Sequence, residues 1–197
     1  MTTASDNFNR ANETPLASPW TTTTGFSQMN LVSNAAEGSS SADSIAVYNS
    51  LTWGPNQTVS VVVGNLSTNN NYSGAGARWD TSGNGFFVWT DGTGGAGHCG
   101  ISSSAGGSET VLANSSTTFA NGDTIGIDIS GTSPNITINL QKNGTTVTTV
   151  SSVSGNNNGQ PAMYAYNNIG PNNDNFNATD NSGASATYPV PQMIFAC

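Results

Sequence analysis

Acidic residues are the first candidates for catalysis in this sequence, because a glycoside hydrolase needs two carboxylates facing each other across a cleft. Asp123 and Asp128 are five residues apart, an odd number that places them on opposite faces of a regular strand. Asp123 also follows Asn121 and Gly122, which favour a turn. No acids are spaced for acid–base catalysis, and we expect this protein not to be an enzyme.

Metal-ligating and nucleophilic side chains are also scarce. The single histidine, His98, lies beside Cys99, and neighbouring strand residues point to opposite faces, which argues against a Cys–His catalytic pair. One histidine and two cysteines are a poor zinc set, because zinc needs three or four ligands. Asp91, Asn173 and Asp174 carry the oxygen ligands that calcium prefers, but such residues are also common in turns. We expect no metal ion and no cofactor, with calcium as the alternative.

Aromatic residues offer a different kind of chemistry, the stacking of rings on a sugar. Phe87 and Trp89 share one face of a predicted strand, and Phe86 and Val88 share the other. One face must pack into the core, and the other is available to a sugar or a neighbouring protein. Trp79 also either packs into the core or is available to a sugar. Trp79 and Trp89 are therefore the candidate sugar-stacking residues, with core packing as the alternative.

Two cysteines, Cys99 and Cys197, leave three alternatives open. They form a bridge within one chain, a bridge between subunits, or no bridge, because a buried free cysteine behaves as a small hydrophobic residue. Two unbridged thiols are the simplest interpretation, and the position of Cys197 at the end of an apolar segment adds weight to a bridge between subunits.

The elements that must position these residues are mostly strands. Isoleucines at 125, 127 and 129 alternate with small or polar residues, as in a strand with one buried face. Asn143-Gly144 favours a two-residue type I′ hairpin turn, and 131–134 is a second turn. We expect almost no helix, because no stretch shows a helical period. Further strands are expected at Ser44–Asn49, Gln57–Leu66, Ala75–Trp79, Gly85–Thr90, His98–Ser103, Glu109–Ala113, Ile136–Leu140, Thr146–Val150 and Gln160–Asn167.

The two ends of this strand-rich region resemble each other. Asp6-Asn-Phe-Asn9 recurs as Asp174-Asn-Phe-Asn177. We expect the first and last strands to lie side by side and to close a single β-sandwich domain over residues 1–178.

Residues 179–197 form an extended tail with an apolar end. This end either folds back onto its own sheet or docks on a neighbouring subunit, and we favour the second alternative. The candidate docking residues are Tyr188, Val190, Met193, Ile194 and Phe195.

Composition excludes several classes of partner. The chain has 197 residues, of which three are Lys or Arg and eleven are Asp or Glu, so its net charge is −8. So few cations do not build a binding surface for nucleic acid or for an anionic membrane. The sequence also has no apolar run of membrane-spanning length. Its first residues do not resemble a secretion signal, so we expect either that a signal was already removed or that the protein is made in the cytoplasm.

Several short motifs resemble the concanavalin A-like lectin/glucanase superfamily over residues 6–178. They are Asp6-Asn-Phe-Asn-Arg10, Gly76-Ala-Arg-Trp79, Gly85-Phe-Phe-Val-Trp89, Asn121-Gly-Asp-Thr-Ile-Gly-Ile127, Lys142-Asn-Gly144 and Asp174-Asn-Phe176. The resemblance implies an all-β jelly roll of two packed antiparallel sheets. The sequence looks most like the jelly-roll modules found in bacteriophage virion proteins and in uncharacterised bacterial proteins. The acid motif of the superfamily's retaining glucanases is missing, since Glu13, Glu37 and Glu109 lack a partner at its spacing.

These observations lead to an expected function in binding rather than in catalysis. We expect an outer structural protein of a bacteriophage virion, made in the host cytoplasm. A capsid decoration protein is favoured over a tail fibre or baseplate component. It would bind the major capsid or other virion proteins and form a homo-oligomer, for which a trimer is a guess. The alternative is an extracellular carbohydrate-binding module or lectin that recognises surface glycans.

Overall fold

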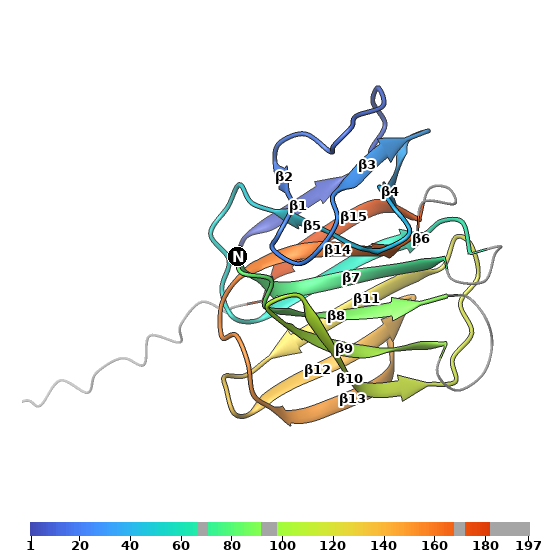
Figure 1. The fold of residues 1–197 in the computed structure, drawn as a ribbon. Coiled ribbons are helices and arrows are strands. Elements are labelled where there is room, and N and C mark those ends of the chain that lie inside the picture. Colours follow the sequence, from blue (N-terminus) through green and yellow to red (C-terminus); the bar gives the residue numbers. More distant parts are fainter. Residues whose placement is uncertain (67–70, 92–97, 168–171, 182–197) are drawn as a thin grey trace, which may run out of the picture.

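The computed structural model describes residues 1–66, 71–91, 98–167 and 172–181. These residues form fifteen strands and no helix, and the strands build two antiparallel sheets packed face to face (Figure 1). The expected β-sandwich with almost no helix is confirmed. Within the described ranges, no helix is long and apolar enough to cross a membrane.

Sheet A contains eight strands, with the N-terminal strand β1 (Thr3–Asp6) pairing with the last strand. The order of the other seven is β13 (Thr145–Val153), β12 (Ile136–Lys142), β11 (Thr124–Ser130), β6 (Gln57–Val63), β15 (Asn173–Asp180), β4 (Ala35–Gly38) and β3 (Met29–Val32).

Sheet B contains seven strands and faces sheet A across the core. Its order is β10 (Ser108–Ser115), β9 (Cys99–Ala105), β8 (Gly85–Thr90), β7 (Tyr72–Trp79), β14 (Gln160–Tyr166), β5 (Asp43–Tyr48) and β2 (Trp20–Thr21).

The main core lies between the two sheets and follows the alternation of the strands. The three isoleucines of β11 are fully buried there, as the sequence predicts. Phe86 and Val88 of β8 enter the same core from sheet B, while Phe87 and Trp89 face the other way. The predicted division of β8 into two faces is therefore confirmed.

Two predicted local features also hold. Asn143 and Gly144 have φ angles of 50° and 77°, and they join paired residues Lys142 and Thr145 as a type I′ turn requires. The repeated Asp-Asn-Phe-Asn segments do lie side by side, because Asp6 of β1 pairs with Phe176 of β15 (Figure 1). The closing strand continues to Asp180, two residues beyond the predicted end of the sandwich domain at 178.

A bulge in β7 changes which face its last residue occupies. Trp79 pairs with Gln160 and Gly76 pairs with Ala162, so β7 has one more residue than β14 in this interval. Arg78 accommodates the bulge with a φ of 56°. Simple alternation would place Trp79 with Ala77 in the main core, but the bulge moves it to the outer face of sheet B.

Arg78 itself is fully buried and holds three loops together. Its guanidinium donates to the carbonyl oxygens of Pro55, Gly131 and Asn156, at 2.7, 2.8 and 3.1 Å. Burial lowers the pKa of Arg78 to about 10. The side chain is therefore a structural anchor and is not available to a ligand.

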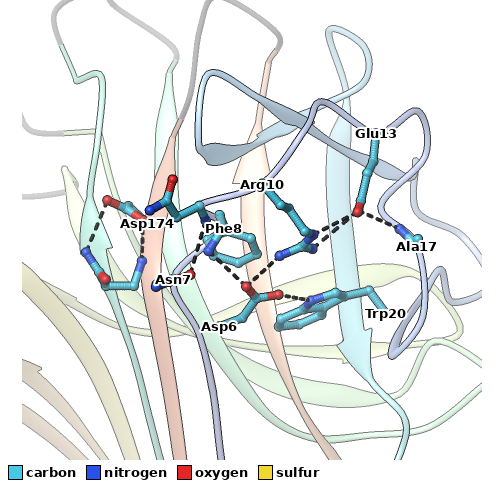
Figure 2. Close-up of polar contacts among 10 residues, drawn as sticks. Asp6, Asn7, Phe8, Arg10, Glu13, Ala17, Trp20 and Asp174 are labelled. Atoms are coloured by element: carbon cyan, nitrogen blue, oxygen red, sulfur yellow. Dashed lines mark hydrogen bonds and ion pairs between the residues drawn. The ribbon is translucent and has the colours of Figure 1, made fainter.

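A second polar anchor fixes β1, and we call it the N-terminal network (Figure 2). Its side chains are those of Asp6, Arg10, Glu13 and Trp20. Asp6 Oδ1 accepts hydrogen bonds from Arg10 and from the backbone N–H of Phe8, and Asp6 Oδ2 accepts one from the indole of Trp20. Arg10 also donates to both carboxylate oxygens of Glu13, at 2.7 and 3.3 Å.

Candidate functional site

The outer face of sheet B carries a second apolar cluster, separate from the core between the sheets. Seven buried residues form this outer cluster: Ile45, Val47, Trp79, Phe87, Trp89, Ala162 and Tyr164. Phe26, Tyr72 and Tyr166 are partly buried against them. An outer sheet face this rich in aromatic rings indicates a surface that packs against another part of the protein or binds a ligand.

Glycines leave space on the sheet for the indole rings of the two tryptophans of this cluster. A Cβ atom at Gly76 or at Gly85 would clash with the indole of Trp79. A Cβ atom at Gly100 would lie 3.1 Å from the indole of Trp89. The glycine-rich sequence of sheet B is therefore a packing requirement of its outer face.

Residues 22–27 form a strap across one part of the outer cluster. Thr24 bonds to the carbonyl of Thr81 through both its N–H and its hydroxyl. The ring of Phe26 packs edge-on against Trp79, with centroids 5.2 Å apart. The strap rejoins sheet B where the N–H of Ser27 donates to the carbonyl of Asp43 at 2.9 Å. Trp79 is consequently buried beneath the strap.

The part of the face that the strap leaves open contains a cavity of about 380 Å³, which we call the groove. This volume lies within the range of small-molecule sites in proteins. Its lining comes from five strands of sheet B and consists of Asp43, Tyr72, Trp89, Glu109, Val111, Tyr164 and Tyr166. Val111 is 47% exposed, so the rim of the groove offers apolar surface to solvent.

Hydrogen bonds fix both walls of the groove. On one wall, the Tyr164 hydroxyl donates to Asp43 Oδ1 at 2.6 Å. On the other, the Trp89 indole N–H donates to Ser102 Oγ at 2.9 Å, and Ser102 donates to Glu109 Oε1 at 2.6 Å. Each carboxylate keeps a second oxygen with no hydrogen-bond partner among the described residues, so both are able to accept from a ligand.

Aromatic rings form the floor between these walls. Tyr72 lies edge-on to both Trp89 and Tyr166, with ring centroids 5.6 Å apart in each pair. Burial raises the pKa of the Tyr72 hydroxyl, and the carboxylates of Asp91, Glu109 and Asp43 raise it further. Tyr72 thus lies in the negative field of acids from several strands. The groove combines flat apolar rings with hydrogen-bond acceptors, which is the surface that a sugar ring requires.

The structure separates the two predicted sugar-stacking residues. Trp89 is 8% exposed and lines the groove. Trp79 has no exposed surface, and its indole N–H donates to the Phe86 carbonyl at 3.1 Å, so it offers no stacking surface to a sugar. The reason is the combination of the β7 bulge, which moves Trp79 outward, and the strap, which covers it.

Residues considered for catalysis or metal binding have structural partners instead. Asp128 accepts from Thr58 and Asn139, and Asp123 pairs with Lys142 at 2.9 Å. His98 Nδ1 lies 2.7 Å from Asp91 Oδ2.

The three residues weighed as calcium ligands also bond to protein groups. Asn173 Oδ1 accepts from Ser73 and Gly74, and the Asp174 carboxylate accepts from Asn175, while Asp91 contacts His98. Among the described residues, no group of three or more His, Cys, Asp or Glu side chains could hold a metal ion.

Cys99 is a buried free thiol that donates to the carbonyl oxygens of Thr117 and Ser115, at 3.1 and 3.5 Å. Burial raises its pKa, which disfavours the reactive thiolate. Cys197 and the docking residues Tyr188, Val190, Met193, Ile194 and Phe195 lie outside the described residues. The disulfide and docking predictions therefore stay predictions.

Sequence reasoning identified only Trp89 among the residues that line the groove. It missed Asp43, Glu109 and the three tyrosines Tyr72, Tyr164 and Tyr166. Tyr164 and Tyr166 share a strand face by simple alternation, and this signal was present in the sequence. The convergence of the others depends on the strand order, which their separation along the chain does not show.

Comparison with known proteins supports the fold only. No family model matches the sequence, and no curated protein matches it. The structure is similar to the carbohydrate-binding module CBM66 from Bacillus subtilis, with 15% identity and a TM-score of 0.56 over 81% of this chain and 90% of that one. It is also similar to the carbohydrate recognition domain of Emp46p, with 11% identity and a TM-score of 0.54 over 83% and 88% of the two chains.

An enzyme shares the same architecture. The β-glucanase of Bacillus licheniformis has 14% identity and a TM-score of 0.51, and the match covers 90% of this chain and 97% of that one. The chain therefore has the galectin-like or concanavalin A-like jelly-roll fold. Because this fold occurs both in binding modules and in a glucanase, the function must be argued from the groove.

Proposed function

We propose that this protein is a non-catalytic carbohydrate-binding module whose binding site is the groove on the outer face of sheet B. The observation that carries the proposal is the convergence of aromatic rings with two hydrogen-bonded carboxylates in one cavity of about 380 Å³. Trp89, Tyr72 and Tyr166 supply the apolar surface for a sugar ring. Asp43 and Glu109 supply acceptors for its hydroxyl groups.

The positions of the acids support binding without catalysis. Asp43 is on β5 and Glu109 is on β10, which are the second-last strand and the opposite edge strand of sheet B. No strand of sheet B carries two carboxylates among its described residues. The acids therefore act as hydrogen-bond acceptors at the two sides of the ligand, and the middle of the face presents rings, glycine and serine.

The expected role in an outer virion particle remains a prediction alongside this proposal. It depends mainly on the composition and on the apolar residues after Asn181. A decoration protein that also adheres to glycans would combine both roles, on the virion exterior or in another extracellular location. Co-sedimentation of the chain with particles would support that combination.

A glycan screen followed by calorimetry tests the binding proposal. We expect at least one glycan class to bind saturably and Tyr72→Ala to weaken binding at least about tenfold, which corresponds to about 1.4 kcal/mol. Leu51→Ala is the control, because Leu51 is 42% exposed and does not line the groove. Failure of every glycan to bind, or equal affinity in Tyr72→Ala, would contradict the proposal.

A further inference from the structure

The two charged side chains that line the groove are both acidic. Asp43 and Glu109 line it, and the Asp91 carboxylate also raises the pKa of Tyr72 in its floor. Among the residues that the structure describes, no lysine or arginine lines the groove. A ligand with an acidic group would therefore meet like charges and no counter-ion.

The three strong cations of the chain are all engaged elsewhere. Arg10 pairs with Asp6 and Glu13 in the N-terminal network. Arg78 is buried among backbone carbonyls. Lys142 pairs with Asp123 on sheet A. None of them neutralises the groove, so a ligand that carries a positive charge would supply the missing counter-ion.

The rings of the groove provide a second and independent feature that favours a cation. Tyr72 stands edge-on to both Trp89 and Tyr166, so the face of Tyr72 points in a different direction from theirs in the lining of the same cavity. Electron-rich faces arranged in this way attract an ammonium group through cation–π interactions. Asp43 and Glu109 line the same cavity, and the second oxygen of each can accept a charge-assisted hydrogen bond from the ammonium group.

We infer that the groove selects glycans whose sugars carry a free, protonated amine, such as de-N-acetylated amino sugars, over neutral glycans and against anionic ones. This inference rests on the proposed function, because it assumes that the groove binds sugars. The sugar ring stacks on the aromatic floor, and its ammonium group lies between the rings and a carboxylate.

Three oligosaccharide series of equal length test the inference by calorimetry: glucosamine oligomers, their N-acetylated counterparts and oligouronates. We expect glucosamine oligomers to bind at least about fivefold more tightly than the acetylated series, as cation–π and charge-assisted contacts imply. We expect no binding of oligouronates. The preference should shrink as the salt concentration rises from about 0.02 to about 0.5 M, because salt screens exposed charges.

Two double variants separate a specific site from general attraction to an acidic protein. Asp43→Asn with Glu109→Gln removes two charges from the groove, and Asp128→Asn with Asp174→Asn removes two from strands of sheet A. We expect only the groove variant to lose the preference for the free amine, because only it removes the carboxylates that line the groove. Equal loss in both double variants would overturn the inference.

The outcomes also distinguish this inference from the proposed function. Neutral oligomers that bind in the groove as tightly as glucosamine oligomers, or more tightly, would overturn the selectivity and leave the binding function intact. Failure of all three series, together with failure of the wider glycan screen, would overturn both.

Discussion

Two regions of this molecule join a tryptophan indole to a carboxylate, and they do so with opposite results. In the N-terminal network, the Trp20 indole donates directly to Asp6, whose two oxygens accept three hydrogen bonds in all and whose charge is paired with Arg10 (Figure 2). In the groove, the Trp89 indole reaches Glu109 through Ser102, and Glu109 has neither a cation nor a second donor among the described residues.

The difference explains why we propose the groove, and not the N-terminal network, as the binding site. In the N-terminal network, a tryptophan and a carboxylate stabilise the fold, because a cation and a backbone N–H use the remaining hydrogen-bonding capacity of the carboxylate. In the groove, Trp89 and Glu109 remain available to a ligand, because Glu109 has one oxygen without a hydrogen-bond donor and a charge without a counter-ion among the described residues. The groove is thus identified by its unmet hydrogen-bonding and electrostatic capacity, not by its aromatic content alone.

Removing the acid from each region should give the largest contrast. Asp6→Ala leaves the buried indole N–H of Trp20 and the guanidinium of Arg10 without this acceptor, and we expect a loss of about 3 kcal/mol in unfolding free energy. Glu109→Ala should change the unfolding free energy by less than about 1 kcal/mol, because the side chain is exposed. Urea denaturation of both variants measures this difference, and similar losses would erase the proposed distinction.

Replacing the tryptophan by phenylalanine in each region sharpens the comparison. Trp20→Phe should lower the unfolding free energy by about 2 kcal/mol, since it removes a donor to Asp6 and leaves space in a buried site. It should leave glycan affinity unchanged. Trp89→Phe should weaken glycan binding by about threefold to tenfold, because stacking area and the fixed wall at Ser102 are lost. Calorimetric titration of both variants checks the assignment of the binding site to the groove. The assignment fails if Trp20→Phe weakens glycan binding as much as Trp89→Phe does.

Acid should destabilise the protein through the N-terminal network. The Arg10 hydrogen bond, and then the backbone N–H of Ala17, hold the pKa of Glu13 below its usual 4.5. The unfolded chain therefore takes up a proton at higher pH than the folded one, so this stabilisation is present above about 4.5 and is lost as the pH falls below it. We expect the Tm advantage of the parent protein over Glu13→Gln to shrink between pH 6 and about pH 3. A constant advantage would contradict this role of Glu13.

Alkali should act on the groove instead, with a smaller effect. Burial, and then the Asp43 carboxylate, raise the pKa of Tyr164 well above 10. Because the unfolded chain loses this proton first, the stabilisation is complete below pH 10 and is lost as the pH rises toward the folded pKa. Tyr164→Phe should flatten the decline of Tm above pH 10 relative to the parent protein. An equal decline of Tm above pH 10 in the parent protein and in Tyr164→Phe would contradict the raised pKa of Tyr164.

Much of the fold was predictable because it depends on local alternation and turn chemistry. The isoleucines of β11 and the Asn143-Gly144 turn specify strands and a hairpin without reference to the rest of the chain. The repeated Asp-Asn-Phe-Asn segments also predicted the pairing of β1 with β15.

The site was less predictable because it depends on non-local arrangement. Asp43 and Glu109 meet at one groove only through the order of six strands in sheet B. The bulge at Arg78 and the strap that carries Phe26 decide that Trp79 is covered while Trp89 is not. Neither a positive φ at an arginine nor the path of a loop follows from residue spacing.

The most direct test of glycan binding at the groove is an NMR titration that follows the indole N–H signals of the four tryptophans. The probes are glucosamine oligomers and any glycan that binds in the screen, and Trp89→Phe and Trp20→Phe assign the two relevant signals. We predict that a binding glycan shifts the Trp89 signal in a saturable manner and leaves the Trp20 signal unchanged. A shift confined to Trp20, or binding that moves no indole signal, would contradict the assignment of the groove as the binding site.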